Sequence, residues 1–432
     1  MNNKKNKVFI TGIVITILGI AVYSPIVSFI MASIFLISVI FIIKGFDPLP
    51  FIIIFSLSII ASFDLIKTGY LVIIGLSIIY LFYFLINKKY RRKIKISKYY
   101  MFFYIWVVYV GVQLIFLPQN ESTWEHVRSL VFGVIIIWLM SRIIYSKERL
   151  RLIYLVWGVC IVLTIIVGYW EIFTGDSLRP TTAYPHLDVA TVGFYNQNNY
   201  SFYLALSLPI IFYWLQGGFI QKVAGLLTIG SIFYLVYVND SRSVILMIFI
   251  SLCALIIKLF ISGQRALGTT IIMILVIAAL LNVDLFSNAY ESIYSLNNDS
   301  DVSMNKRKEL TISGVNIFKE NPILGVGPGN SEYYMFSVGD KVHNFWLEIL
   351  INYGPLILIG LISFFLSSLV MFFKNTPKEI RELMWPLLWT VIIFIPTSLT
   401  PSTIFNFQIL WFLFGLMLCA NTIIKNTKKG DY

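Results

Sequence analysis

Charged residues are scarce in this sequence: Asp, Glu, Lys and Arg make up only 12% of its 432 residues, whereas 58% are hydrophobic. A water-soluble chain of this length would have no interior large enough to hide so much apolar surface. The apolar residues also come in blocks long enough to cross a bilayer as helices, which takes about 20 residues. The composition therefore excludes an ordinary soluble domain and predicts an all-α integral membrane protein.

Cysteine is also rare, with only three residues that lie far apart in apolar blocks: Cys160, Cys253 and Cys419. This spacing suits neither a disulfide framework nor a metal site, so we expect the three cysteines to be buried small hydrophobic residues. His126 and His186 have no partner at a metal-binding spacing either.

The apolar blocks predict a bundle of about 12–14 transmembrane helices. Met1–Lys7 is basic, but the block that follows it lacks a small-x-small cleavage site, so we expect a retained span and not a signal peptide. The expected spans are 8–22, 25–43, 50–66, 68–86, 99–117, 128–145, 152–172, 199–215, 223–238, 244–261, 267–285, 355–373, 384–399 and 403–424.

The net charge of +12 is explained by topology. With a cytoplasmic N-terminus, most Lys and Arg residues fall in inner segments, including the dense run at 88–98, while the acids lie mainly outside. We therefore expect both termini in the cytoplasm and no binding of nucleic acid.

Polar residues gather in three long outer loops, Pro118–Val127, Phe173–Asn198 and Phe286–Gly354. We expect one membrane domain over 1–432. It divides into N-terminal helices (1–172), a core (173–373) with outer loops 173–198, 239–243 and 286–354, and C-terminal helices (374–432). Few ionisable residues fall near a predicted midplane, which disfavours a transporter.

Two arginines in these outer segments stand out. Arg242 lies in a very short outer loop, against the positive-inside bias; it either binds a phosphate group through its guanidinium fork or reaches lipid phosphate or Asp240. Arg307 begins a stretch, Lys308–Lys319, that we expect to be helical, and the alternative for this arginine is a solvated charge run.

His343 opens a predicted short outer helix, Val342–Tyr353, that ends at a Gly354-Pro355 break. It is either a general base with a pKa near neutrality or an interfacial cap beside an anchoring tryptophan. Asn344 and Glu348 lie four residues apart on one face of this helix.

Several other polar residues have a commoner structural interpretation. Gly325, Gly327 and Gly329 could form a backbone nest for an anion, although turn formation is favoured. Asn196 and Asn198, which follow Arg179 in the loop Phe173–Asn198, are typical turn or cap residues. The acids of this region, Glu171, Asp188 and Asp240, are typical solvated loop residues.

Three stretches in order resemble the O-antigen ligase and O-antigen polymerase (Wzy-type) family of bacterial membrane glycosyltransferases. They are Gly193-Phe-Tyr-Asn196-Gln-Asn198, then Ser241-Arg242, then Arg307 followed by Asn321–Gly329 and His343–Gly354. The resemblance covers residues 179–365 and implies a GT-C-like helical bundle whose long outer loop contains short helices. Gln197 departs from the family, which often has proline between the two asparagines.

The resemblance implies a polyprenyl-diphosphate-linked glycan as donor, usually on undecaprenyl diphosphate, and no cofactor, metal or nucleotide. It assigns catalysis to His343, Arg242 and Arg307. Substrate binding is then expected from Arg179, Asn196, Asn198, Asn344 and Glu348. The partners would be this donor, a glycan or lipid-linked acceptor, and membrane lipids.

The expected function is that of a polysaccharide polymerase acting on the extracytoplasmic side of the cytoplasmic membrane. A ligase that moves a finished glycan to a lipid, wall polymer or protein would differ only in its acceptor. A lipid-linked oligosaccharide flippase is a further alternative, and a purely structural scaffold would leave the two arginines and the histidine unexplained.

Overall fold

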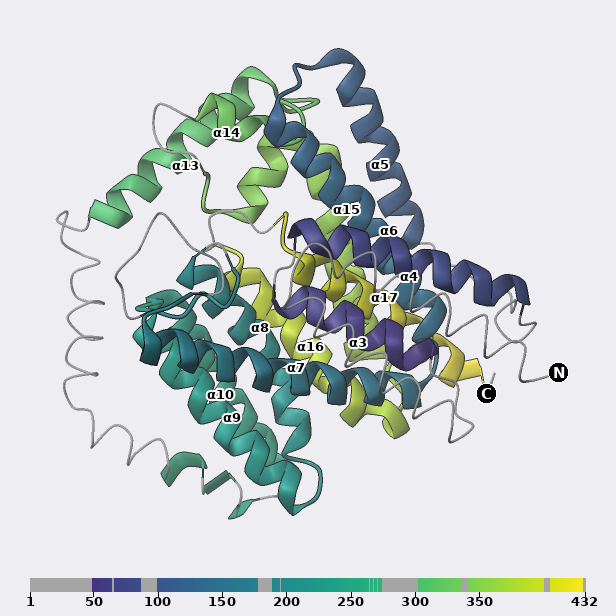
Figure 1. The fold of residues 1–432 in the computed structure, drawn as a ribbon, viewed down its shortest axis with the longest axis vertical. Helices are drawn as coiled ribbons and strands as arrows, with labels where there is room; N and C mark the ends of the chain where they lie inside the picture. Colours follow the sequence, from purple (N-terminus) through teal and green to yellow (C-terminus); the bar gives the residue numbers. More distant parts are fainter. Residues whose placement is uncertain are drawn as a thin grey trace.

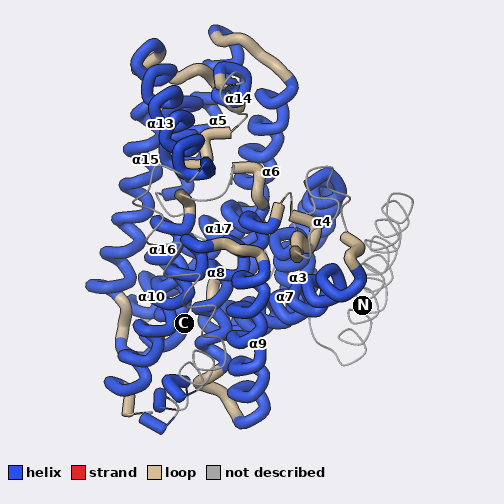
Figure 2. Tube along the Cα trace, turned by 90° about the vertical axis from the view of Figure 1, so that its left-hand side faces the viewer, coloured by secondary structure: helices blue, strands red, loops and turns tan. Residues whose placement is uncertain are grey.

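The computed structural model describes residues 49–63, 66–86, 99–177, 189–194, 196–263, 265–266, 268–269, 271–273, 302–335, 341–399 and 405–429. Within these ranges the protein is built of helices and loops, with no strand (Figures 1 and 2). The helices are α3 (Leu49–Ser62), α4 (Ile66–Ile86), α5 (Tyr99–Phe116), α6 (Glu121–Ile143), α7 (Lys147–Thr174), α8 (Gln197–Trp214), α9 (Phe219–Val238), α10 (Arg242–Ile261), α13 (Val302–Glu320), α14 (Asn330–Tyr334), α15 (Phe345–Asn375), α16 (Arg381–Thr397) and α17 (Gln408–Lys429).

Eight of the described helices are long and apolar enough to cross a membrane. They are α5, α6, α7, α9, α10, α15, α16 with the 3₁₀ turn before it, and α17. The expected all-α membrane class is therefore confirmed, and the protein is a multi-pass membrane protein. The predicted spans 8–22 and 25–43 lie outside the described residues, as does most of 267–285.

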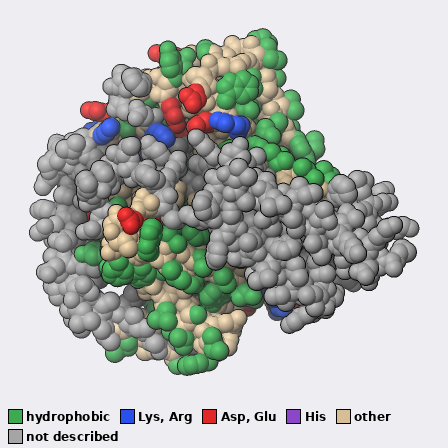
Figure 3. Space-filling view, viewed as in Figure 1, with side chains coloured by type: hydrophobic (Ala, Val, Ile, Leu, Met, Phe, Trp, Pro, Cys, Tyr) green, Lys and Arg blue, Asp and Glu red, His purple; other side chains and the backbone are tan. Residues whose placement is uncertain are grey.

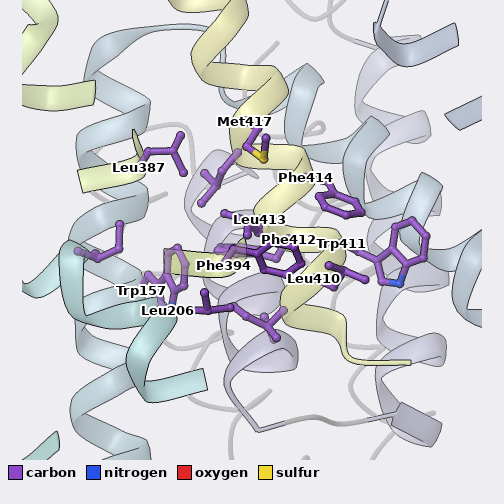
Figure 4. Packing of buried hydrophobic residues seen from close by; sticks show 14 of the residues in the cluster. Trp157, Leu206, Leu387, Phe394, Leu410, Trp411, Phe412, Leu413, Phe414 and Met417 are labelled. Carbon is purple, nitrogen blue, oxygen red and sulfur yellow. The ribbon is translucent and has the colours of Figure 1, made fainter. Parts of the chain in front are cut away.

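Helices α8 and α17 form the centre of the bundle. α17 packs along α6, and α8 packs along α16. Figure 4 shows buried side chains of this core, in which Trp157 of α7 and Phe412 of α17 meet edge to face with ring centroids 5.0 Å apart. Although α8 begins with the polar run Gln-Asn-Asn, nearly all of it is buried, so protein and not lipid surrounds this helix.

Helices α8 and α10 both run antiparallel to α16. Trp214, near the end of α8, and Leu383, near the start of α16, line one cavity. Lys258, near the end of α10, binds Glu382 at 2.7 Å. α15 starts where α16 ends, because the Phe345 backbone N–H donates to the Ser398 carbonyl at 3.1 Å. The starts of α8, α10 and α15 and the end of α16 therefore share one end of the bundle, which we call the site end.

The surface divides by polarity. Exposed apolar side chains cover the long helices, as expected of a lipid-facing surface, and much of the lower part of Figure 3 is hydrophobic. Most of the coloured charged side chains in this view form a band in its upper part, over the region of α13 and α14. α13 is the most polar of the long helices and carries exposed charges at Lys306, Lys308 and Glu309.

The predicted loop Pro118–Val127 is wrong, because α6 already begins at Glu121. Asn120 caps this helix: its side-chain oxygen accepts from the Thr123 N–H at 2.9 Å, and the Thr123 hydroxyl accepts from the Asn120 N–H at 3.1 Å. The polar side chains at 121–126 led us to expect a loop, but the cap supplies the partners that the first helical N–H groups need.

Candidate active site

His343 lies in a strained turn at the site end, directly before α15. Its φ of 51° is left-handed, a conformation that few non-glycine residues adopt, and its side chain is half-buried. The turn is held in place because the next-but-one residue, Phe345, is bonded to the end of α16. The structure thus fixes the backbone on which this histidine stands.

Asn344 is the N-cap of α15. Its side-chain oxygen accepts from the backbone N–H groups of Trp346 at 3.1 Å and Leu347 at 3.2 Å. The cap occupies this oxygen, so only the amide nitrogen of Asn344 remains for a substrate contact.

Glu348 lies one turn further along α15 and is only 3% exposed. Its carboxylate Oε1 lies 3.8 Å from Nε2 of His126, which is fully buried on α6. The His126 ring stacks on Phe405 with centroids 4.9 Å apart, and its Nδ1 lies 3.4 Å from the Tyr353 hydroxyl. His126 is therefore a core residue beneath the start of α15, and the expectation that it lies in an outer loop is wrong.

The glycine loop 321–329 closes the break in α15. Gly354 has φ 71° and Pro355 has no N–H, so the carbonyls of Ile351 and Asn352 lose their helical donors. The N–H groups of Val326 and Gly327 replace them at 2.8 and 3.0 Å. The anion nest is therefore wrong and the turn interpretation is confirmed, since these backbone donors already bind carbonyls.

Buried amide side chains hold the glycine loop against α5 and α6, and the sequence patterns did not point to them. The Gln113 side chain donates to the carbonyls of Leu324 at 2.6 Å and Asn352 at 2.9 Å. Asn330, only 1% exposed, donates to the carbonyls of Pro118 and Val326 and accepts from Thr123. As a lone Gln in the apolar block 99–117, Gln113 could have been identified, whereas Asn330 follows a glycine-rich turn and gave no such signal.

Arg307 lies on the face of α13 that packs against α15. Leu310, Gly314 and Ile317 follow it at helical spacing, and all three are buried. Gly314 is close to Leu347 of α15. Arg307 itself is half-buried, whereas its neighbours Lys306 and Lys308 are exposed. The arginine is thus separated from the charge run in which it lies in the sequence.

Arg242 is the first residue of α10, and a hydrogen bond joins this start to that of α8. The Ser241 hydroxyl donates to the side-chain oxygen of Asn198 at 2.7 Å. Asn196 caps α8 by accepting from the Asn199 N–H at 3.0 Å, as its cap interpretation predicts. Arg179 lies outside the described residues.

The expectation that Glu171 is a solvated acid is wrong. Its side chain is 2% exposed and accepts two backbone hydrogen bonds from the loop 189–194. Asp240, in contrast, is exposed as expected. Among the described residues, no group of three or more His, Cys, Asp and Glu side chains could hold a metal ion.

Most of the predicted site residues that the structure describes therefore lie at three starts of helices at one end of the bundle. Asn196, Asn198 and Arg242 belong to the starts of α8 and α10, and His343 and Asn344 to the start of α15. Helix α13, which carries Arg307, packs against α15 (Figure 1).

Residues 226–365 match the family model of the O-antigen ligases (Wzy_C). The matched range includes Arg242, Arg307 and His343, and it confirms the family resemblance of the sequence. The teichuronic acid biosynthesis protein TuaE of Bacillus subtilis (strain 168) is 25% identical over 360 residues, which cover 76% of this chain and 72% of the relative. Together they support a polysaccharide glycosyltransferase or ligase.

Proposed function

We propose that the protein is a glycosyltransferase that joins polyprenyl-diphosphate-linked glycan repeat units into a polysaccharide. One observation carries the proposal. Among the described residues, three non-glycine residues have a left-handed backbone: Val192, Asp240 and His343. All three lie at the site end, beside or within the motifs that carry the resemblance. Such strain costs about 1–3 kcal/mol per residue and collects where function requires a particular backbone position.

The residue types match the chemistry of this transfer. A hydroxyl oxygen of the acceptor attacks the anomeric carbon of the donor, and the bond from that carbon to the diphosphate oxygen breaks. We assign the hydroxyl proton to His343, acting as a neutral base. We assign the negative charge that develops on the leaving polyprenyl diphosphate to Arg242 and Arg307.

The substrate contacts that we propose are Arg179, Asn196, Asn198 and the amide of Asn344. Glu348 reaches a substrate only if its carboxylate turns away from His126. We place the site on the extracytoplasmic side, because the positive-inside distribution of Lys and Arg puts the site end there. A lipid-linked glycan that has been flipped across the membrane would be accessible at that surface.

The product that we propose is a cell-envelope polysaccharide, in keeping with the name of the Bacillus subtilis relative, a teichuronic acid biosynthesis protein. A ligase that transfers a finished chain is the second candidate, and the description of the matched family as O-antigen ligase favours it. The two functions share the donor and the proposed catalytic residues, and they differ in the acceptor.

Incubation of the purified protein with lipid-linked repeat units in detergent tests the proposal. Longer glycans, with release of polyprenyl diphosphate, identify a polymerase. Transfer of one intact chain to an added acceptor identifies a ligase. Should neither product form while liposomes containing the protein move the lipid-linked glycan between leaflets, the protein is a transporter and the proposal is wrong.

The Arg242→Ala variant tests the site within the same assay. We expect turnover to fall at least about tenfold, because a charge-assisted contact to the diphosphate is worth roughly 1.5–3 kcal/mol. Full activity in a correctly folded Arg242→Ala protein would remove this residue from the site. Lys306→Ala is the control, because Lys306 is exposed on α13.

A further inference from the structure

The buried acid Glu171 binds the backbone of the loop 189–194. It lies in the last turn of α7, and its Oε2 accepts from the N–H groups of Thr191 at 2.6 Å and Val192 at 2.8 Å. Val192 and Gly193 both have positive φ, at 51° and 85°. Two successive backbone donors thus converge on one carboxylate oxygen, which compensates the acid for its loss of water.

Asn239 binds the same loop from the other side. It is 1% exposed and pairs with Ala190 in both directions: its side-chain oxygen accepts from the Ala190 N–H at 2.9 Å, and its amide donates to the Ala190 carbonyl at 3.0 Å. The amide also lies 3.2 Å from the Ser201 hydroxyl of α8. Asn239 stands three residues before Arg242, at the end of α9.

The loop 189–194 is also closely packed at Gly193 and Phe194. A Cβ atom at Gly193 would lie 2.8 Å from the Phe63 carbonyl oxygen, so only glycine fits there. The next residue, Phe194, is fully buried against Tyr203 and Phe407. The loop is therefore a rigid element that connects α7 with the turn between α9 and α10.

The turn between α9 and α10 consists of only three residues, Asn239, Asp240 and Ser241, and Arg242 follows it as the first residue of α10. Asp240 is left-handed with φ 47°, and Ser241 is bonded to Asn198 of α8. Because the turn is so short, the backbone of Arg242 cannot shift without breaking the bonds of Asn239 or Ser241. The position of the start of α10 thus depends on the loop, and the position of the loop depends on Glu171.

We propose that Glu171 and Asn239 are positioning residues that hold Arg242 where it meets the diphosphate of the donor lipid. This inference rests on the function proposed above. Neither residue touches the substrate; they act through the loop 189–194 and the α9–α10 turn. Their effect is therefore specific to the diphosphate group and passes through Arg242.

A double-mutant cycle on lipid binding tests this inference with the full-length protein in detergent. Binding of polyprenyl diphosphate is measured for Glu171→Ala, Arg242→Ala and the double variant, with uncharged polyprenol as a second ligand. We expect Glu171→Ala to weaken diphosphate binding about tenfold in the parent protein and less than about twofold in the Arg242→Ala background. Polyprenol binding should be the same in all four proteins.

Two further variants and one control variant complete the test. Glu171→Gln should retain most of the affinity, because one amide oxygen can still accept both N–H groups. Asn239→Ala should behave like Glu171→Ala, and it replaces that variant if Glu171→Ala fails to fold. Glu382→Ala is the matched acidic control: this exposed residue lies near the start of α16, at the opposite end of the bundle, and should bind diphosphate normally.

The outcomes separate the inference from the proposed function. Equal losses from Glu171→Ala in the two backgrounds, or a matching loss of polyprenol binding, would mean that Glu171 only supports the fold. Normal diphosphate binding by both Glu171→Ala and Asn239→Ala would also overturn the inference. If Arg242→Ala itself binds and turns over like the parent protein, then the proposed function is wrong in its site.

Discussion

The start of α10 and the break within α15 at Gly354 both hold irregular backbone inside a membrane protein, but they hold it in different ways. At α10, side chains do so: Glu171 and Asn239 bind the backbone of the loop 189–194. At the break in α15, backbone binds backbone, because Val326 and Gly327 donate to the carbonyls that the break leaves open, and the Gln113 side chain adds one further bond to Asn352. Buried polar backbone must find partners within the protein in either case. The comparison teaches that the start of α10 depends on particular side chains, whereas the break in α15 depends mainly on glycines.

The largest expected effect concerns His343, because it separates strain from chemistry at α15. His343→Asn keeps a residue that tolerates the left-handed backbone but removes the base. We expect glycan transfer to fall about 10²–10⁴-fold, the usual contribution of a general base, with an unchanged melting temperature. Chain-length analysis of the products measures the rate of transfer, and intrinsic fluorescence measures the melting temperature. A variant that keeps half of the parent activity would show that His343 is only a turn residue.

The next largest effect is expected from a substitution at the glycine-dependent break in α15. In Gly354→Ala, the added Cβ would lie 2.3 Å from the Ile323 carbonyl oxygen on a backbone with φ 71°. We expect a loss of stability on the order of 3 kcal/mol from strain and displacement of the loop, seen as a lower melting temperature. Gly111→Ala is the control, since its Cβ would meet nothing within 4 Å. Equal melting temperatures for the two variants would contradict the role given to the break.

A third change tests whether burial distinguishes Arg307 from its charge run. Arg307→Ala should lower the rate of transfer per unit of donor about 10- to 100-fold, as expected for the loss of a bond to a charged group. Lys308→Ala, one residue away and exposed, should leave that rate unchanged. If the two variants lose activity equally, the half-buried position of the arginine has no functional meaning.

The smallest effect comes from the cap that orients the start of α15. Asn344→Ala removes the acceptor for the Trp346 and Leu347 N–H groups. We expect a loss of about 1 kcal/mol in stability and a modest fall in activity, both largely restored in Asn344→Asp. Thermal melting and transfer assays of the pair measure this. If Asn344→Asp regains the stability but loses as much activity as Asn344→Ala, the amide nitrogen, which both variants lack, and not the cap is the important group.

Local patterns predicted much of the fold. Helix α13 was expected from Lys308–Lys319, and the break at Gly354-Pro355 follows from proline chemistry alone. The start of α6 was missed because Asn120 and Thr123 form a cap without the usual Glu or Gln at its third position. The stretch Glu121–His126 is polar enough to suggest a loop, and only the cap and the packing of His126 against Phe405 show that it is helical.

The sequence predicted the residue types of the site, but it did not predict the buried contacts that hold these residues in position. Arg242, Arg307 and His343 were identified by motif order, and they remain predictions as catalytic residues. The three closely spaced glycines of the glycine loop suggested an anion nest as one alternative. The backbone N–H groups of Val326 and Gly327 instead bind carbonyls of α15, more than 20 residues away. Glu171 was expected to be a solvated acid because the N–H groups that bind it lie 20 and 21 residues further along the chain, where a local pattern does not reveal them.

The sequence by itself determined that this chain is a helical membrane protein, which of its segments are helices, and which residue types are available for chemistry. These follow from apolar runs, charge bias and proline, whose effects are local. Only the tertiary structure decided which polar groups are buried and what they bind. A carboxylate such as Glu171 or a donor such as the Gly327 N–H has no fixed role until packing removes water and brings it a partner.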